Sequence, residues 1–136
     1  MAIHDGYESV VGQVVELKAD ADGGFNVSRV ICVVDCGIAI NPDVVKAQME
    51  SGIIFGLTAA LYGQIDIDAG RIRQSNFHDY RMVRLAESPE IEVYIVEGAD
   101  KPGGVGEPGT PPLAPALANA LFAATGQRVR ELPLTL

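Results

Sequence analysis

The stretch from Lys101 to Pro112, called here the glycine loop, constrains the fold of this chain more than any other. It contains four glycines and four prolines, so some backbone positions are unusually free while others have a fixed φ and no N–H donor. This composition predicts a stiff loop rather than a helix or a strand. The apolar residues that follow predict a helix over 113–125, with Gly126 as its C-cap.

Glu107 is the single carboxylate of the glycine loop. One interpretation is functional: the N–H groups of Gly103 to Gly106, next to a helix N-terminus, bind an anionic or oxo ligand while Glu107 acts as a base. The other is that the loop is only the turn that leads into the helix, because Gly and Pro mark turns of every kind. The loop alone leaves both interpretations open.

A second helix is predicted over residues 43–62. Asn41 is a plausible N-cap and Pro42 suits the first helical position. Gly52 and Gly56 stand inside this helix, where a glycine costs about 0.5–1 kcal/mol relative to alanine. We therefore expect a strand or the other helix to pack closely on the face that carries these glycines.

Several stretches predict strands through their β-branched or alternating apolar residues. They are 9–18, 25–35, 64–68, which could pair back with 71–74, and 90–96. The first two form a hairpin around the turn at 19–24. Residues 30–34 are apolar throughout, which is typical of a central strand covered on both faces.

The order of these elements predicts an α+β fold in a single domain over residues 1–136. We expect a two-layer sandwich, with a mixed or mostly antiparallel sheet packed against two main helices. In the helix over 113–125, Leu117, Leu121 and Phe122 lie near one side and are expected in the core.

Two other groups of residues invite a chemical role that their spacing does not support. Cys32 and Cys36 lie four apart on one extended strand, where a disulfide is geometrically awkward and buried thiols are expected. No histidine spacing completes a zinc site with them. His78 and Asp79 are adjacent, so in an extended segment they face opposite sides. We expect a structural histidine there.

Charge and hydropathy exclude some partners. The net charge of −8 and the pI near 4.6 argue against nucleic acid or an anionic membrane as a partner, because both would require clustered Lys and Arg. No apolar run is expected to reach the roughly 20 residues of a membrane span, and the first residues lack the pattern of a signal peptide. A cytoplasmic and a periplasmic location both stay open.

Two longer sets of sequence segments resemble a known family. One consists of 104–108 in the glycine loop followed by 114–120, and the other of 35–37, 41–42 and 48–57. Both resemble the C-terminal part of the molybdopterin-binding large subunit of the molybdenum hydroxylases, the family of xanthine dehydrogenase and aldehyde oxidase. Residues 75–80 and 88–93 are similar to the isoquinoline 1-oxidoreductase branch. The resemblance covers nearly the whole chain.

The resemblance implies a role for particular residues. Glu107 would be the catalytic base, Gln48 would hydrogen-bond the pterin, and Gly104, Val105 and Gly106 would line the molybdenum site. No side chain of this chain would ligate a metal. The implied cofactor is molybdenum–molybdopterin, in its cytosine dinucleotide form.

The resemblance also implies partners. These are the remainder of the large subunit, a small subunit that carries iron–sulfur clusters, and a small-molecule substrate. The substrate would be an isoquinoline-like N-heterocycle or an aldehyde, oxidised with water as the oxygen source. Two cysteines cannot ligate clusters that need four each, so we expect the isolated chain to be inactive. The alternative function is a non-catalytic domain that uses residues 103–107 to bind an anion or nucleotide, or that serves only in assembly.

Overall fold

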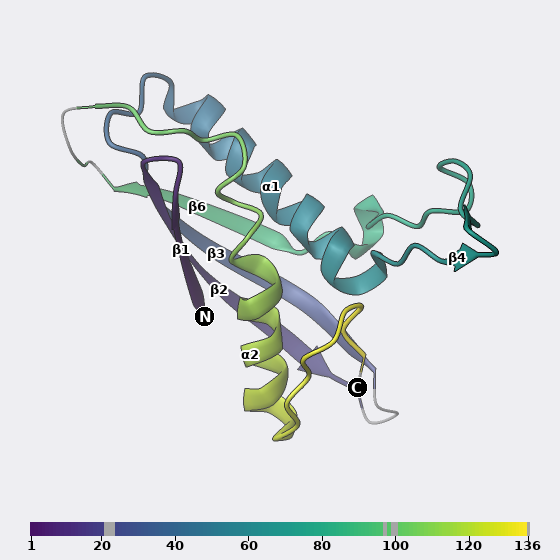
Figure 1. Cartoon of the computed structure of the whole chain (residues 1–136). Coiled ribbons are helices and arrows are strands. Elements are labelled where there is room, and N and C mark those ends of the chain that lie inside the picture. Colours follow the sequence, from purple (N-terminus) through teal and green to yellow (C-terminus); the bar gives the residue numbers. More distant parts are fainter. Residues whose placement is uncertain (21–23, 97, 99–100, 136) are drawn as a thin grey trace.

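The computed structural model of the chain describes residues 1–20, 24–96, 98 and 101–135 (Figure 1). Its main sheet has the strand order β1-β2-β3-β6, formed by Ala2–Gly6, Ser9–Ala19, Phe25–Asp35 and Glu90–Val96. The first three strands pair antiparallel, and β6 pairs parallel to β3. A separate small hairpin consists of β4, Ile67–Asp68, and β5, Arg71–Ile72.

Two helices cover one face of the main sheet. α1 spans Pro42–Tyr62 and α2 spans Leu113–Thr125, while a single 3-10 turn at Leu85–Glu87 precedes β6. α1 packs on β6, and α2 packs on β2 and β1. In Figure 1 the glycine loop runs alongside α1 before it leads into α2. The predicted α+β sandwich with a mixed sheet and two main helices is confirmed.

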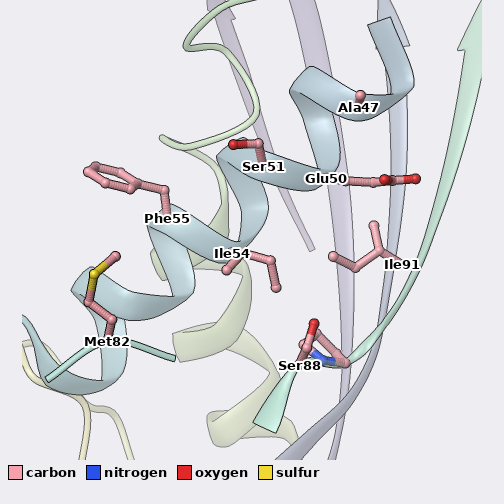
Figure 2. Close-up of a pocket in the computed structure, with 9 residues that line it drawn as sticks. Ala47, Glu50, Ser51, Ile54, Phe55, Met82, Ser88 and Ile91 are labelled. Carbon is pink, nitrogen blue, oxygen red and sulfur yellow. The ribbon is translucent and has the colours of Figure 1, made fainter. Parts of the chain in front are cut away.

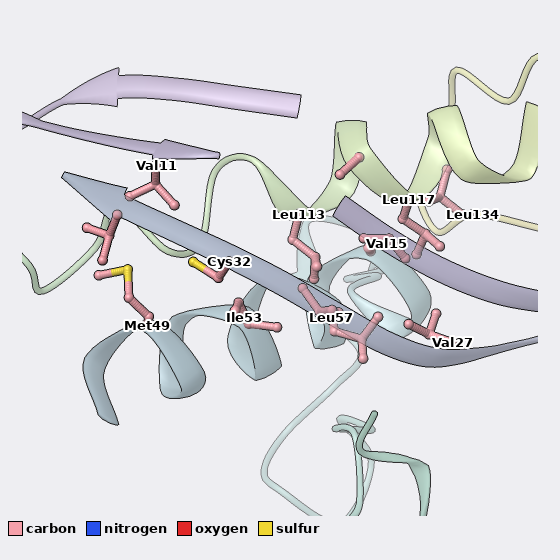
Figure 3. Packing of buried hydrophobic residues seen from close by; sticks show 14 of the residues in the cluster. Val11, Val15, Val27, Cys32, Met49, Ile53, Leu57, Leu113, Leu117 and Leu134 are labelled. Carbon is pink, nitrogen blue, oxygen red and sulfur yellow. The ribbon is translucent and has the colours of Figure 1, made fainter. Parts of the chain in front are cut away.

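The hydrophobic core lies between the sheet and the helices (Figure 3). The helices contribute side chains that are fully buried: Met49, Ile53 and Leu57 from α1, and Leu113, Leu117 and Leu121 from α2. They face the inward side chains of the two central strands, among them Val11, Val15, Val30, Cys32 and Val34. The core therefore closes around one side of the sheet only.

The prediction that Phe122 lies in the core is wrong. Its side chain is half-buried, and the Arg128 guanidinium carbon lies 3.5 Å from the centre of its ring. Leu113, Leu117 and Leu121 follow each other at four-residue spacing and form the buried stripe of α2. Phe122 stands one position beyond this stripe and thus at its edge.

The outward face of the sheet carries exposed apolar side chains. Val14 and Val33 are 39% and 40% exposed, and Tyr94 is 55% exposed. At one end of this face Arg29 makes ion pairs with Glu16 and Glu92. Residues 30–34 were predicted to be covered on both faces, which is wrong for the outward face because both helices lie on the inward one.

Some local elements differ from the prediction. β1 was not predicted, since Ala2–Gly6 is short and its alternation is weak. The strand expected over 64–68 is reduced to the two residues of β4, although its predicted partner does pair back as β5. In the predicted turn at 19–24, residues 21–23 lie outside the described residues.

α1 is long and apolar enough to cross a membrane by length and composition alone. The expectation that no apolar run reaches this length is therefore wrong for this helix. A single such helix is weak support for a membrane location, because the core helix of a globular domain passes the same test. Met49, Ile53 and Leu57 pack against the sheet, so the apolar character of α1 is accounted for by its place in the core.

Candidate functional site

The first half of the glycine loop is tied to the sheet. The N–H of Gly103 donates to the Cys36 carbonyl at 2.8 Å, and the N–H of Gly104 donates to the Tyr7 carbonyl at 2.7 Å. Ser9 Oγ donates to the Gly104 carbonyl at 2.8 Å. The N–H groups of Gly103 and Gly104 are therefore already bonded within the protein. This contradicts the hypothesis that these two groups bind an anionic or oxo ligand.

Close packing requires glycine at both of these positions. A Cβ on Gly103 would overlap the Glu8 carbonyl oxygen, and a Cβ on Gly104 would lie 3.0 Å from Tyr7 Cβ. Tyr7 and Glu8 form the turn between β1 and β2, with φ values of 60° and 59°. Positive φ at both central residues is characteristic of a tight type I′ hairpin turn. The loop therefore rests on a hairpin turn that was not predicted from the sequence.

The backbone at Glu107 is held in a tight turn from two sides. The Thr110 N–H donates to the Glu107 carbonyl at 2.9 Å. From the sheet, Gln13 Nε2 donates to the Gly109 carbonyl at 2.7 Å, and from α1 the Gly52 carbonyl accepts from Thr110 Oγ1 at 3.2 Å. The Glu107 side chain is exposed, so a free carboxylate projects from a fixed backbone.

The two glycines of α1 allow the loop to reach the helix. A Cβ on Gly52 would lie 3.2 Å from the Gly109 carbonyl carbon, and a Cβ on Gly56 would lie 2.9 Å from the Thr110 carbonyl oxygen. The close approach predicted for this face is confirmed. Its main partner is the end of the glycine loop, with Leu113 at the start of α2 beside it, rather than a strand.

This packing brings Gln48 and Glu107 to one cavity of about 340 Å³. The cavity is lined by Gln48, Ser51, Gly52, Phe55, Gly106, Glu107, Thr110 and Pro111. Gly106 lines the cavity opposite Gln48, and a Cβ there would lie in ordinary van der Waals contact, 3.9 Å from Gln48 Nε2. Gln48 is half-buried, and within the described part of the chain its amide has no hydrogen-bond partner.

Of the five predicted site residues, the structure brings together Gln48, Gly106 and Glu107. Gly104 and Val105 do not line the cavity. Gly104 lies against Tyr7, and the half-buried Val105 packs against the hydrophobic core.

The sequence did not single out Phe55 or Thr110 as neighbours of Glu107. Phe55 is 64% exposed, although most of α1 faces the core. Gln48, Ser51 and Phe55 are spaced by three and seven residues, which places them on one face of the helix. This helical spacing, counted from Gln48, is the signal that could have found Ser51 and Phe55.

A larger open groove of about 610 Å³ borders the same site (Figure 2). It lies between α1 and the chain around β6, and it shares Ser51 and Phe55 with the cavity at Glu107. In Figure 2 Phe55 projects from α1 on the side opposite Ile91. Glu107 does not line this groove, where Glu50 is the lining carboxylate.

The other candidate residues lie apart from this cavity. His78 Nε2 is 3.6 Å from Asp79 Oδ2, because the segment is a turn here rather than the extended strand assumed in the prediction, and the His78 side chain is 75% exposed. Hydrogen bonds from the backbone N–H groups of Asn76 and Ser75 lower the pKa of Asp79 to about 2. This carboxylate therefore stabilises its own turn.

The buried free thiols predicted at Cys32 and Cys36 are confirmed. Burial raises the pKa of the Cys32 thiol to about 11, so it stays protonated at neutral pH. Among the residues that the structure describes, no three His, Cys, Asp or Glu side chains gather as a metal site.

Comparison with known proteins identifies the family. The family model of the molybdopterin cofactor-binding domain matches residues 6–89, which is more than half of the chain. This chain belongs to the molybdopterin cofactor-binding domain family. The matched range includes Gln48 and ends before the glycine loop.

Individual relatives of this molybdopterin cofactor-binding domain are much longer proteins. The isoquinoline 1-oxidoreductase subunit beta of Brevundimonas diminuta is 45% identical over 114 residues, which cover 84% of this chain and 15% of that protein. The membrane-bound aldehyde dehydrogenase (pyrroloquinoline-quinone) of Gluconacetobacter polyoxogenes is 34% identical over 122 residues, which cover 89% of this chain and 16% of that protein. The chain thus spans about one sixth of the length of these relatives.

The fold of the domain is also found in a solved enzyme structure. Quinoline 2-oxidoreductase from Pseudomonas putida 86 superimposes with a TM-score of 0.81 and 22% identity, over 92% of this chain and 17% of that one. At this identity the similarity shows a shared fold.

Proposed function

We propose that residues 1–136 form one domain, the C-terminal part of the catalytic large subunit of a molybdenum hydroxylase, with Glu107 as its base. The observation that carries this proposal is the cavity at which Gln48 of α1 and Glu107 of the glycine loop meet. The relatives whose names are those of oxidoreductases support the same reaction class.

The residues at the cavity suit a pterin cofactor. The Gln48 amide offers a donor and an acceptor to the edge of a heterocycle, and it has no competing partner among the described residues. Gly106 adds no side chain to block that edge. In this proposal Gln48 holds the pterin of molybdenum–molybdopterin in its cytosine dinucleotide form, while Gly104 and Val105 shape the loop that faces the metal.

When bound, the molybdenum cofactor would supply two-electron oxidation with oxygen derived from water. The protein's part is proton transfer and orientation. Glu107 would accept a proton at a carboxylate oxygen from the water-derived nucleophile, and the turn that holds its backbone would fix the point from which the side chain reaches into the cavity. The exposed position of the side chain leaves it accessible from the cavity.

The substrate that the cavity favours is a planar N-heterocycle rather than an aldehyde. The exposed ring of Phe55 borders the cavity that Glu107 lines, and an aromatic face binds a flat heteroaromatic ring by offset stacking. The names of two similar proteins, an isoquinoline and a quinoline oxidoreductase, agree with this choice.

The partners in this proposal are the rest of the large subunit and a small subunit with iron–sulfur clusters that receives the electrons. The outward face of the sheet, with Val14, Val33 and Tyr94 exposed, provides an apolar surface for the rest of the large subunit. Contiguous apolar surface of this kind commonly marks an interface. This chain spans only 15% and 16% of two relatives. The much larger remainder of such a subunit is therefore the partner that we assign to this face.

The deciding experiment is Glu107→Gln in the complete enzyme, with molybdenum quantified in each preparation. Glutamine keeps the shape but accepts no proton, so the rate of the reductive half-reaction should fall by about 10²-fold or more while cofactor content is unchanged. Glu50→Gln is the matched control, because Glu50 lies on α1 but outside the cavity.

Two outcomes would contradict the proposal. A variant that keeps more than about a tenth of the wild-type rate has lost too little for a general base. An active enzyme without molybdenum, or with pyrroloquinoline quinone in its place, would show that the name of the aldehyde dehydrogenase relative is the better guide to the cofactor.

A further inference from the structure

Gln13 is an unusual side chain for its position. It lies on β2 between Val11 and Val15, on the face of the sheet that is covered by the helices, and it is fully buried. A side-chain amide in such a place must find hydrogen-bond partners, because an unpaired polar group in the core destabilises the fold. Its partner is the glycine loop.

The hydrogen bond of Gln13 ends two residues from Glu107. Gln13 Nε2 donates to the Gly109 carbonyl at 2.7 Å, and Gly109 is buried within the turn that the Thr110 N–H closes on the Glu107 carbonyl. Gly109 itself packs on α1, since a Cβ there would lie 3.2 Å from the Met49 carbonyl oxygen. The amide thus connects the middle of the sheet to the turn that carries the base.

The second polar atom of the same side chain is left without a partner. Gln13 Oε1 is buried and makes no hydrogen bond to any described residue. Cys32, the cross-strand neighbour of Gln13, is a neutral thiol: burial raises its pKa to about 11, and a side-chain hydrogen bond with Gln13 offsets only part of this rise. An apolar side chain of similar size would fill this space without leaving an unpaired acceptor. What it would lose is the bond to Gly109 and the weaker contact with the Cys32 thiol.

We propose that Gln13 is a positioning residue for Glu107, which holds the turn at 107–110 in place through its hydrogen bond to the Gly109 carbonyl. The inference rests on the proposed role of Glu107 as base. Proton transfer is sensitive to a misplacement of about 1 Å, whereas Phe55 and Gln48, the residues proposed to bind substrate and cofactor, are side chains of α1 and not of this turn. Loss of the amide should therefore lower kcat and leave KM unchanged.

The first test concerns the chain without cofactor. Gln13→Met keeps the size of the side chain and removes its hydrogen bonds, and the amide hydrogen exchange of Thr110 should become about 10-fold faster, as expected for the loss of one buried hydrogen bond. Thr58→Val is the matched control: Thr58 is a buried polar residue of α1 that bonds the Ile54 carbonyl and the Val83 N–H. It should leave Thr110 exchange unchanged.

The second test uses the molybdenum-loaded enzyme. In Gln13→Met, kcat per bound molybdenum should fall by about 10- to 100-fold with KM changed by less than about twofold. Thr58→Val should leave both constants unchanged. Gln13→Asn, which keeps an amide but withdraws it by one methylene, should reproduce the effect if Gln13→Met does not fold.

Three outcomes of these two tests would overturn the inference that Gln13 positions Glu107. Unchanged Thr110 exchange would mean that Gln13 does not hold the turn. Faster exchange with unchanged kcat would make it a structural residue alone, as would failure of both variants to fold. None of these results bears on whether Glu107 is the base, which Glu107→Gln tests separately.

Discussion

Gly56 of α1 is a residue at which the usual rule for helix glycines should reverse. Replacing a helix glycine by alanine normally stabilises a protein by about 0.5–1 kcal/mol. Here the added Cβ would lie 2.9 Å from the Thr110 carbonyl oxygen and 3.2 Å from Leu113 Cβ, and the first of these is backbone that must move. We expect Gly56→Ala to lower the free energy of unfolding by about 1–3 kcal/mol, measured by urea denaturation.

The control for this substitution lies on the same helix. Ser51 is exposed, and Ser51→Ala should change stability by no more than about 0.5 kcal/mol. If Gly56→Ala were as stable as the wild type, the loop would be free to shift away from α1, and the close fit at the glycine face would not constrain it.

The two adjacent residues Leu121 and Phe122 should differ sharply. Leu121 is fully buried, so Leu121→Ala should destabilise the chain by about 2–5 kcal/mol. Phe122 is half-buried and its ring contacts the Arg128 guanidinium. We expect Phe122→Ala to cost less than Leu121→Ala, because much of the ring is already in water. Equal shifts of the denaturation midpoint would place the ring in the core after all.

At the residue scale, resemblance found more of the site than physical reasoning did. Glu107 stood out already as the single carboxylate of the glycine loop, but its role as base was left open there; the family resemblance chose that role and added Gln48, and the structure brings the two to one cavity. Gln13 was harder to find. In the sequence it is one amide among valines of a predicted strand, and its role cannot be predicted until the hydrogen-bond partner across the core is known. Phe55 was equally hidden, because an exposed apolar residue on a helix resembles a core residue in sequence.

At the element scale, the segment that joins β5 to β6 is held by two carboxylates. Asp79 accepts hydrogen bonds from the N–H groups of Ser75 and Asn76. Glu87 accepts from the Tyr62 hydroxyl at 2.7 Å and from the Arg84 N–H at 3.0 Å, and it pairs with Arg81. These bonds lower the pKa of each carboxyl to about 2.

The sign of the resulting pH dependence follows from these depressed values. The stabilisation is complete above the ordinary pKa values of 3.8 and 4.5, and it is lost as the pH falls towards about 2. We expect the Ser75 and Arg84 amides to lose exchange protection between these limits, before the amides of β3. In Glu87→Gln the Arg84 amide should lose this pH dependence. Protection of Arg84 that persists at pH about 2 would contradict the assignment.

The elements themselves were predictable where periodicity and caps agree. α1 begins as predicted from Asn41, whose side chain accepts from the Asp43 and Val44 N–H groups, and α2 ends at Gly126 with positive φ. β1 was missed because the turn that joins it to β2 uses Tyr7 and Glu8, which hold positive φ without the glycine or asparagine that marks such turns.

At the scale of the whole molecule, the sheet has one covered face and one open face. The sequence shows that a strand such as 30–34 is apolar on both faces. It does not show which part of the protein, if any, packs on each face. Both helices in the described part of the chain lie on the inward face, so Val33 and Tyr94 stay exposed. In the proposed enzyme the rest of the large subunit covers them.

This arrangement predicts a contrast between two valine-to-threonine substitutions. Val33 on the outward sheet face is 40% exposed and Val44 on α1 is 52% exposed, so either change should alter the stability of the chain itself by no more than about 0.5 kcal/mol. A hydroxyl buried without a partner in an interface costs about 1–3 kcal/mol. Val33→Thr should therefore weaken binding to the separately expressed rest of the large subunit by about 10-fold or more, measured by calorimetry, whereas Val44→Thr should not. Equal affinities for the two variants would show that the outward face of the sheet is not where the rest of the subunit docks.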